Sequence, residues 1–152
     1  MKRVMIGKYI WIMSLGNPTV EAALKRHWEA SDAGDLDVEH EIYREDAVLD
    51  YPQSGERIRG RSTIRESRAA QPSTKRFAVR RIVGDGSLWI TEYILTYDNI
   101  PSYVVSIMEF SDGLVAWETQ YFAGSFDPGP SRALLVERMG DDQLAVSVAR
   151  AG

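Results

Sequence analysis

The sequence predicts a single α+β domain, in which three helices are followed by an antiparallel sheet. Three observations support this fold class. The length of 152 residues fits one domain of ordinary size. Helical patterns come first along the chain, and strand patterns dominate after residue 74. The breaks between the later strands are short and contain Gly, Asn or Asp, which is typical of hairpin turns.

The first predicted helix begins at Pro18 and ends at Gly34. Asn17 is a favourable N-cap, proline is well tolerated at the first helical position, and glycine commonly ends a helix. At helical spacing, one face carries Val20, Leu24, His27, Trp28 and Ser31. This face is expected to pack against the sheet.

Two shorter helices are expected next. Asp35 can cap the first of them, whose apolar face carries Val38 and Ile42. Thr63 and Glu66 have the spacing of a capping box, so they are expected to open the third helix, which Pro72 ends.

The strands are expected at 47–51, 75–83, 88–98, 102–110 and 114–124. A turn-rich loop, 53–60, follows the first of them. The later strands form an antiparallel meander and carry apolar side chains on both faces. Both faces should therefore be covered, one by the helices and the other by a second copy of the chain in a homodimer.

The ends of the chain are expected to lie outside the domain. We predict an N-terminal extension at 1–16, the domain at 17–139 and a flexible tail at 140–152. The apolar run at 9–13 is too short for a signal sequence or a membrane span. There is no cysteine, which is consistent with a cytoplasmic protein.

Charge is segregated along the chain, although the net charge is only −4. Nine of the 18 basic residues lie in 57–81, and nine of the 22 acidic residues lie in 29–50. The basic block could bind an anion or RNA, but it has no interleaved stacking aromatics. We favour two complementary surfaces that pair within the fold, with no nucleic-acid or membrane partner.

Metal and cofactor chemistry is poorly supported by the sequence. His27 and His40 are the only histidines, and they lack metal-ligand spacing. No phosphate-binding glycine loop or dinucleotide fingerprint occurs. We therefore expect neither a metal nor a cofactor.

Several segments between about residues 18 and 124 together resemble one known family. They are 34–36, 43–52, 55–60 with Ile64, 108–110, 112–113, and the strand ending at Tyr121 and Phe122. This pattern is similar to that of SnoaL-like proteins and ketosteroid isomerases, within the nuclear transport factor 2-like superfamily. The resemblance implies a cone, in which a curved antiparallel sheet wraps around three N-terminal helices. It also implies a ligand pocket at the mouth of the cone and a homodimer through the outer sheet face.

The resemblance also indicates which side chains point into the cone. The expected ligand-binding residues are Trp28, Tyr43, Tyr51, Trp89, Tyr93, Ser106, Met108, Gln120 and Phe122. Aromatic clusters are more often plain core than binding site, so two of Trp28, Tyr43, Trp89 and Tyr93 are expected to be core.

The ketosteroid isomerase catalytic set is not conserved at the matching positions. The oxyanion tyrosine falls at His27, the base falls at Tyr51, and the second oxyanion donor falls at Ser106. Only the supporting Tyr43 agrees with that enzyme. The sequence therefore predicts the fold without this isomerase activity.

Three residues are candidates for acid/base chemistry. Glu118 is expected to point inward among apolar and aromatic side chains, although a register slip by one residue would turn it to solvent. His27 lies on the inner face of the first helix, as a proton shuttle or as a hydrogen-bonded core residue. Asp50 could be a base at the pocket mouth or could bond backbone amides in a turn, but strand alternation lets only one of Asp50 and Tyr51 face inward.

Two function classes follow from these candidates. One is a cofactor-free enzyme acting on a small apolar carbonyl or polyketide-like compound, in which Glu118 with His27 or Asp50 moves a proton. The other is a domain that binds a small apolar organic molecule, or dimerises, without turnover. A titratable pair within reach of one ligand atom would favour the enzyme.

Overall fold

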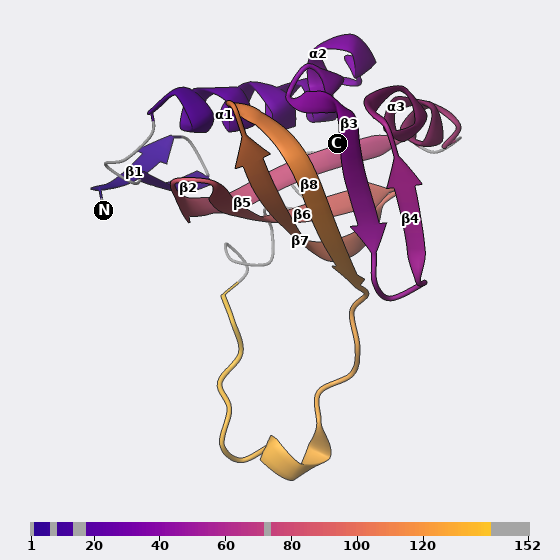
Figure 1. The fold of residues 1–152 in the computed structure, drawn as a ribbon. Helices are drawn as coiled ribbons and strands as arrows, with labels where there is room; N and C mark the ends of the chain where they lie inside the picture. Colours follow the sequence, from indigo (N-terminus) through magenta and orange to yellow (C-terminus); the bar gives the residue numbers. More distant parts are fainter. Residues whose placement is uncertain (1, 7–8, 14–17, 72–73, 141–152) are drawn as a thin grey trace.

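The computed structural model describes residues 2–6, 9–13, 18–71 and 74–140. Its main body is a six-stranded sheet with the order β4-β3-β8-β7-β6-β5. Three helices lie along one face of this curled sheet (Figure 1): α1 (Pro18–Ala33), α2 (Leu36–His40) and α3 (Arg61–Ala69). The strands are β3 (Tyr43–Tyr51), β4 (Glu56–Arg59), β5 (Lys75–Asp85), β6 (Leu88–Tyr97), β7 (Ile100–Ser111) and β8 (Leu114–Ala123). The fold is α+β, as the sequence predicts.

Two small elements are not part of the six-stranded sheet. Strands β1 (Lys2–Ile6) and β2 (Tyr9–Met13) form an antiparallel hairpin, and β2 lies next to β5. After β8 the chain leaves the body of the domain as a long arm that contains only a short 3₁₀ turn, η1 (Pro130–Arg132) (Figure 1). In the described part of the chain, no helix is long and apolar enough to cross a membrane.

The helix boundaries follow local signals in the sequence. Gly34 has a φ of +74°, which ends α1, and the Asp35 side chain accepts a hydrogen bond from the Val38 amide at 3.1 Å to cap α2. The expected N-cap Asn17 and the expected stop Pro72 lie outside the described residues.

The third helix and the segment before it differ from the expectation. Helix α3 begins at Arg61, directly after Gly60, whose φ is +91°, so Thr63 lies inside the helix and does not cap it. Residues 56–59, expected in a loop, form β4 and pair antiparallel with the end of β3. Helix α2 ends at His40, so Ile42 is buried just beyond it. The turns that set these boundaries depend on backbone conformations at glycine, which apolar periodicity does not report.

The sheet contains one pairing that the sequence did not predict. Strands β5 to β8 form the expected antiparallel meander, but β3 is parallel to β8. In this pair Leu49 lies opposite Glu118, and Asp50 lies opposite Thr119. The sheet is therefore mixed, and β3, which follows α2 in the chain, lies beside the last strand of the sheet.

The core fills the space between the helices and the inner sheet face. Leu24 and Trp28 of α1 and Ile64 of α3 pack against inward side chains of the sheet. The largest of these sheet residues, all less than 2% exposed, are Tyr43, Leu49, Ile82, Trp89, Tyr93, Val104 and Met108. Burying such side chains is the main favourable contribution to folding.

The acidic and basic blocks pair with each other, as the complementary-surface interpretation predicts. Five ion pairs join them: Asp32 with Arg76, Asp37 with Arg65, Glu39 with Arg68, Glu45 with Arg61 and Asp50 with Arg57. In four of the five the arginine is exposed to solvent, which limits what the pair contributes to stability. The buried Arg68 is the exception.

A glycine near the end of β5 is expected to tolerate no side chain. A Cβ on Gly84 would lie 2.5 Å from the Leu88 carbonyl oxygen and from the Trp89 ring. The ring is fixed by burial and by the bond from Trp89 Nε1 to the Gly86 oxygen at 3.0 Å. Gly84→Ala should lower the free energy of unfolding by about 1–3 kcal/mol in urea titrations. Gly124→Ala, where a Cβ meets nothing within 4 Å, should change it by less than about 0.5 kcal/mol. Equal effects of both substitutions would contradict this packing.

Candidate functional site

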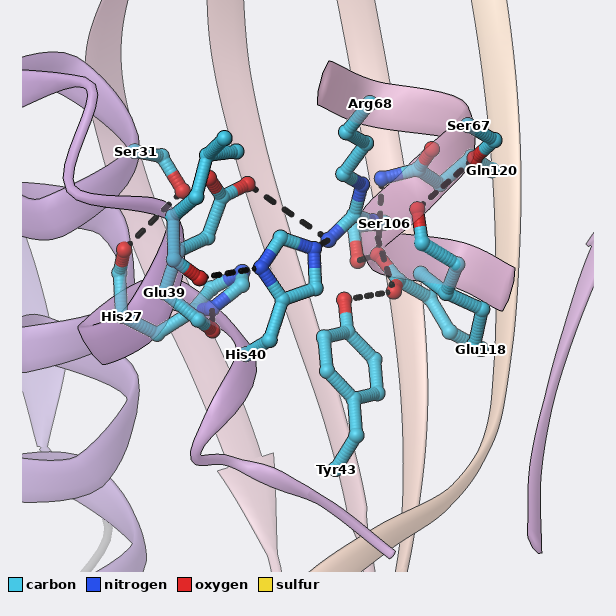
Figure 2. A network of polar contacts seen from close by, with 12 residues as sticks. His27, Ser31, Glu39, His40, Tyr43, Ser67, Arg68, Ser106, Glu118 and Gln120 are labelled. Atoms are coloured by element: carbon cyan, nitrogen blue, oxygen red, sulfur yellow. Dashed lines mark hydrogen bonds and ion pairs between the residues drawn. The ribbon is translucent and has the colours of Figure 1, made fainter. Parts of the chain in front are cut away.

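Glu118 lies at the centre of a polar network inside the cone (Figure 2). It lies on the inner face of β8 and is 0% exposed. Its Oε1 accepts hydrogen bonds from Ser106 Oγ and Gln120 Nε2, both at 2.7 Å. Its Oε2 accepts one from the Tyr43 hydroxyl and lies 3.4 Å from Arg68 Nη2. The prediction that this carboxylate lies among apolar and aromatic side chains is therefore wrong, because four polar groups surround it.

Arg68 links this carboxylate to a second one. It projects from α3, is 9% exposed, and places Nη1 3.5 Å from Glu39 Oε1 and 3.3 Å from His40 Nε2. Its guanidinium carbon also lies 5.3 Å from the centre of the Tyr43 ring. Burial alone would lower the pKa of Arg68, but the negative groups around it raise it well above its usual value. Arg68 therefore stays charged between Glu39 and Glu118.

Burial shifts the pKa of two other members of the network. Tyr43 is buried, and its pKa rises well above the usual value, so its hydroxyl keeps its proton and donates to Glu118. Burial, together with the charge of Arg68, lowers the pKa of His40, whose Nδ1 donates to the Leu36 oxygen at 2.6 Å. His40 is therefore a neutral acceptor for Arg68 at neutral pH.

A cavity of about 40 Å³ opens beside this network. One wall is apolar and mostly aromatic: Trp28, Tyr51, Phe77, Tyr93, Leu95, Tyr97 and Phe122. The other wall is polar: Glu39, Arg68, Gln71, Lys75 and Gln120. Glu118 is not part of the lining, but it contacts Gln120 and Arg68, which are. Such an apolar wall with a few convergent polar groups is typical of ligand sites.

Glu39 is the one carboxylate among the described residues that line the cavity, and it has more open hydrogen-bonding capacity than Glu118. Its backbone belongs to α2, and its side chain is buried. Within the described part of the chain, its carboxylate makes one side-chain contact, the 3.5 Å ion pair to Arg68. Glu118, by comparison, uses both oxygens in four contacts. A ligand in the cavity would therefore meet Glu39 before Glu118.

His27 lies in the core beside the network. Its Nδ1 donates to the Glu39 carbonyl oxygen at 2.6 Å, and its Nε2 is buried with no hydrogen-bond partner among the described residues. Burial, with Arg68 nearby, lowers the pKa of His27 to about 4. No hydrogen bond joins His27 to Glu118 in the described structure, and the imidazole is neutral at pH 7. Neither His27 nor Glu118 lines the cavity, so they do not present a titratable pair to a ligand there.

Asp50 lies away from the cavity. Leu49 lies opposite Glu118, so alternation turns Asp50 to the other face, while Tyr51 lines the cavity. Both Asp50 oxygens accept from Arg57, at 2.6 and 2.9 Å, and Oδ2 also accepts from Trp117 Nε1 at 3.0 Å. Arg57 is the main cause that lowers the pKa of Asp50. Asp50 is therefore an ion-pair residue of the outer face.

The remaining predicted ligand-binding residues divide into three groups. Those that line the cavity are Trp28, Tyr51, Tyr93, Gln120 and Phe122. Tyr43 and Ser106 lie behind it and bind Glu118. Trp89 and Met108 are fully buried core residues away from the cavity lining. Trp28 is held in place by the bond from its Nε1 to Thr91 Oγ1 at 3.1 Å.

Of the polar wall of the cavity, only Gln120 was predicted from the sequence, and the charged residues were missed. Glu39, Arg68 and Lys75 lie inside the two charge blocks, which were assigned to paired surfaces. Helical spacing offered one signal, since Arg68 follows the core residue Ile64 by four positions and so shares its face. Long charged side chains on an inward helix face are candidates for a buried site.

Comparisons with known proteins agree with this architecture. The sequence profile of the SnoaL-like domain matches residues 24–118. A solved NTF-2 like protein of unknown function from Burkholderia xenovorans LB400 is 50% identical, with a TM-score of 0.75 over 80% of this chain and 96% of that one. A candidate ketosteroid isomerase from Kribbella flavida DSM 17836 is 25% identical, with a TM-score of 0.74 over 80% and 90% of the two chains.

A more distant structure shares the fold alone. An LEH-like epoxide hydrolase from M. tuberculosis is 22% identical, with a TM-score of 0.59 over 69% of this chain and 83% of that one. No curated protein matches the chain. The profile match covers more than half of the chain, and the cone built from α1 to β8 is the fold of these relatives. The chain belongs to the SnoaL-like domain family, within the nuclear transport factor 2-like proteins.

Proposed function

We propose that the cone cavity binds a small, neutral, largely apolar organic molecule whose carbonyl oxygen accepts hydrogen bonds from the polar wall. The observation that carries this proposal is the two-sided lining of the cavity. Seven apolar or aromatic side chains form one wall, and the donors Arg68, Lys75 and Gln120 belong to the other. Rings contact the carbon skeleton, while convergent donors fix the position of one oxygen.

The charge balance around the cavity favours a neutral ligand. Arg68 and Lys75 contribute two positive charges, and Glu39 with the underlying Glu118 contributes two negative ones. A carboxylate ligand would add a negative charge close to Glu39, and a cation would meet Arg68. A carbonyl group accepts hydrogen bonds without adding charge, so it avoids both repulsions.

The size of the cavity sets a limit on the ligand. A volume of about 40 Å³ corresponds to roughly three water molecules. Larger ligands need the rings of Tyr51, Tyr97 and Phe122, which are only partly buried, to move aside. A compound with about seven non-hydrogen atoms should bind with a dissociation constant on the order of 1 mM.

Glu39 favours a second candidate function, acid/base catalysis on the bound carbonyl compound. Its carboxylate faces the cavity beside Arg68 and has free lone pairs. It could take a proton from the carbon next to the carbonyl, while the electron pair of that C–H bond moves into an enolate whose oxygen Arg68 stabilises. The protonated Glu39 carboxyl then exchanges its proton with solvent and returns a solvent-derived proton to the carbon, and the enolate reverts to the ketone. Glu118 then acts as a positioning residue that holds Arg68, Gln120 and Tyr43.

Hydrogen–deuterium exchange tests this candidate. Cyclohexanone in D₂O should lose its α-proton NMR signals faster with the protein than without it. Glu39→Gln should reduce the protein-dependent rate by about 100-fold or more, the usual contribution of a general base. Glu29→Gln, at an exposed site, is the matched control and should leave the rate unchanged. If cyclohexanone binds but its exchange is no faster than in buffer, the protein is a binding domain for this class of compound.

A further inference from the structure

The segment that follows β8 exposes more large apolar side chains than a free arm normally carries. Residues 124–140, here called the C-terminal arm, leave the body of the domain after Ala123 (Figure 1). Its apolar side chains are mostly solvent-exposed: Leu134 100%, Leu135 85%, Phe126 81%, Val136 52% and Met139 51%. The backbone hydrogen bonds within the arm join only near neighbours around η1. An apolar surface of this kind usually marks an interaction site.

A matching hollow lies on the outer face of the sheet. It has a volume of about 610 Å³ and spans β5 to β8. Its exposed apolar side chains are Ile90, Tyr103, Val105 and Tyr121. The register places Val105 beside Tyr121 on neighbouring strands, so these side chains form one continuous patch. Arg80, Arg81 and Glu92 form its polar border.

We propose that the C-terminal arm of one copy packs into the outer-face hollow of a second copy, so that two copies exchange arms. This proposal does not depend on the ligand in the cone. It goes beyond a homodimer through the outer sheet face, because it assigns the contact to a particular segment and a particular receptor surface.

The position of the arm's origin supports a second copy as the occupant. The hollow is lined in part by Tyr121, Phe122 and Ala123, and the arm begins at the next residue, Gly124. When two copies face each other across this hollow around a two-fold axis, each arm starts at the seam, next to the partner's surface. Seventeen residues can reach up to roughly 55 Å when extended, which is ample to cross the partner's sheet.

The oligomeric state tests the proposal first. Each chain has a mass of 17.1 kDa, so light scattering after size exclusion should give about 34 kDa for the full chain. Leu134→Asp with Leu135→Asp should weaken dimerisation by at least 100-fold, and Tyr121→Asp should do the same from the receptor side. Ser131→Asp, an exposed polar site in the same arm, is the matched control and should leave the dimer unchanged. A full chain that runs at 17 kDa, or a dimer insensitive to the arm variant, would overturn the proposal.

A spin-label experiment separates exchange between copies from folding back onto the same chain. The described residues and the whole sequence contain no cysteine, so Ser131→Cys carries the only reactive thiol. Ser131→Cys chains without ¹⁵N, each carrying a nitroxide on the introduced thiol, are mixed with ¹⁵N-labelled wild-type chains that carry no nitroxide. Arm exchange should broaden the amide signals of Val105 and Tyr121 in the ¹⁵N chains. Broadening that occurs only when label and ¹⁵N are on one chain would show a fold-back and contradict the proposal.

Discussion

Arg68→Met is expected to lower the free energy of unfolding by about 3–5 kcal/mol. Arg68 is the only cation within ion-pair distance of Glu39 and Glu118 in the described structure, and both carboxylates are buried. Removing it leaves two buried carboxylates without a cation in ion-pair distance among the described residues, which is far more costly than losing a surface ion pair. Urea denaturation followed by circular dichroism measures the change.

The matched control is Arg65→Met, on the exposed side of the same helix. Arg65 pairs with Asp37 at 2.7 Å, but its side chain is 44% exposed and Asp37 is 85% exposed. Its loss should therefore cost less than about 1 kcal/mol. If the two variants lose similar stability, the network around Arg68 does not have the energetic role assigned to it.

The second large effect is a loss of stability in mild acid caused by His27. Its pKa is about 4 in the folded protein, compared with the ordinary value of 6.5 that applies to the unfolded chain. Below pH 6.5 the unfolded chain takes up a proton that the folded chain refuses, so stability falls as the pH drops from about 6.5 to about 4. The difference between the two pKa values corresponds to about 3 kcal/mol in total.

The comparison that isolates this effect is His27→Gln. Glutamine can still donate a hydrogen bond towards the Glu39 carbonyl oxygen, which His27 Nδ1 reaches at 2.6 Å, but it does not titrate. The free energy of unfolding of the wild type should decrease more steeply than that of the variant between pH 6.5 and 4. Parallel curves would show that His27 titrates in the folded protein as it does in the unfolded one.

The elements of the fold were largely predictable because their signals are local. The cap at Asp35, the end at Gly34 and the hairpin breaks between the later strands each depend on a few neighbouring residues. The pairing of β3 with β8 was not predictable in this way, because its partners are about seventy residues apart. Strand β4 was also missed, since four mostly charged residues give no alternating pattern.

In the candidate site too, residues with local signals were predicted and residues that depend on tertiary contacts were not. The resemblance and strand alternation placed Glu118, Gln120 and Tyr93 inside the cone, and helical spacing placed Trp28 there, where the structure has them. Alternation could not choose between Asp50 and Tyr51 until the register with β8 was known. Residues on α2 and α3 were missed, because a charged side chain in a short helix looks the same in sequence whether it faces solvent or a cavity.

The role that we propose for Glu118 differs from the one expected from the sequence, for a physical reason. A single inward carboxylate predicts a dry, free acid, but the donors that surround it come from α3, β3, β7 and β8. Only the tertiary structure brings such distant groups together. We therefore propose that Glu118 positions Arg68 and Gln120 at the cavity wall.

The central claim is that the cavity between the aromatic wall and Arg68 binds a small neutral carbonyl compound. Titration of the ¹⁵N-labelled protein with cyclohexanone tests it most directly. The claim predicts saturable shifts, with a dissociation constant on the order of 1 mM, in the Trp28 indole N–H and the Gln71 and Gln120 side-chain amides. Cyclohexanecarboxylate should bind more weakly. Shifts that do not saturate, or that fall on Val105 and Tyr121 of the outer face, would contradict it.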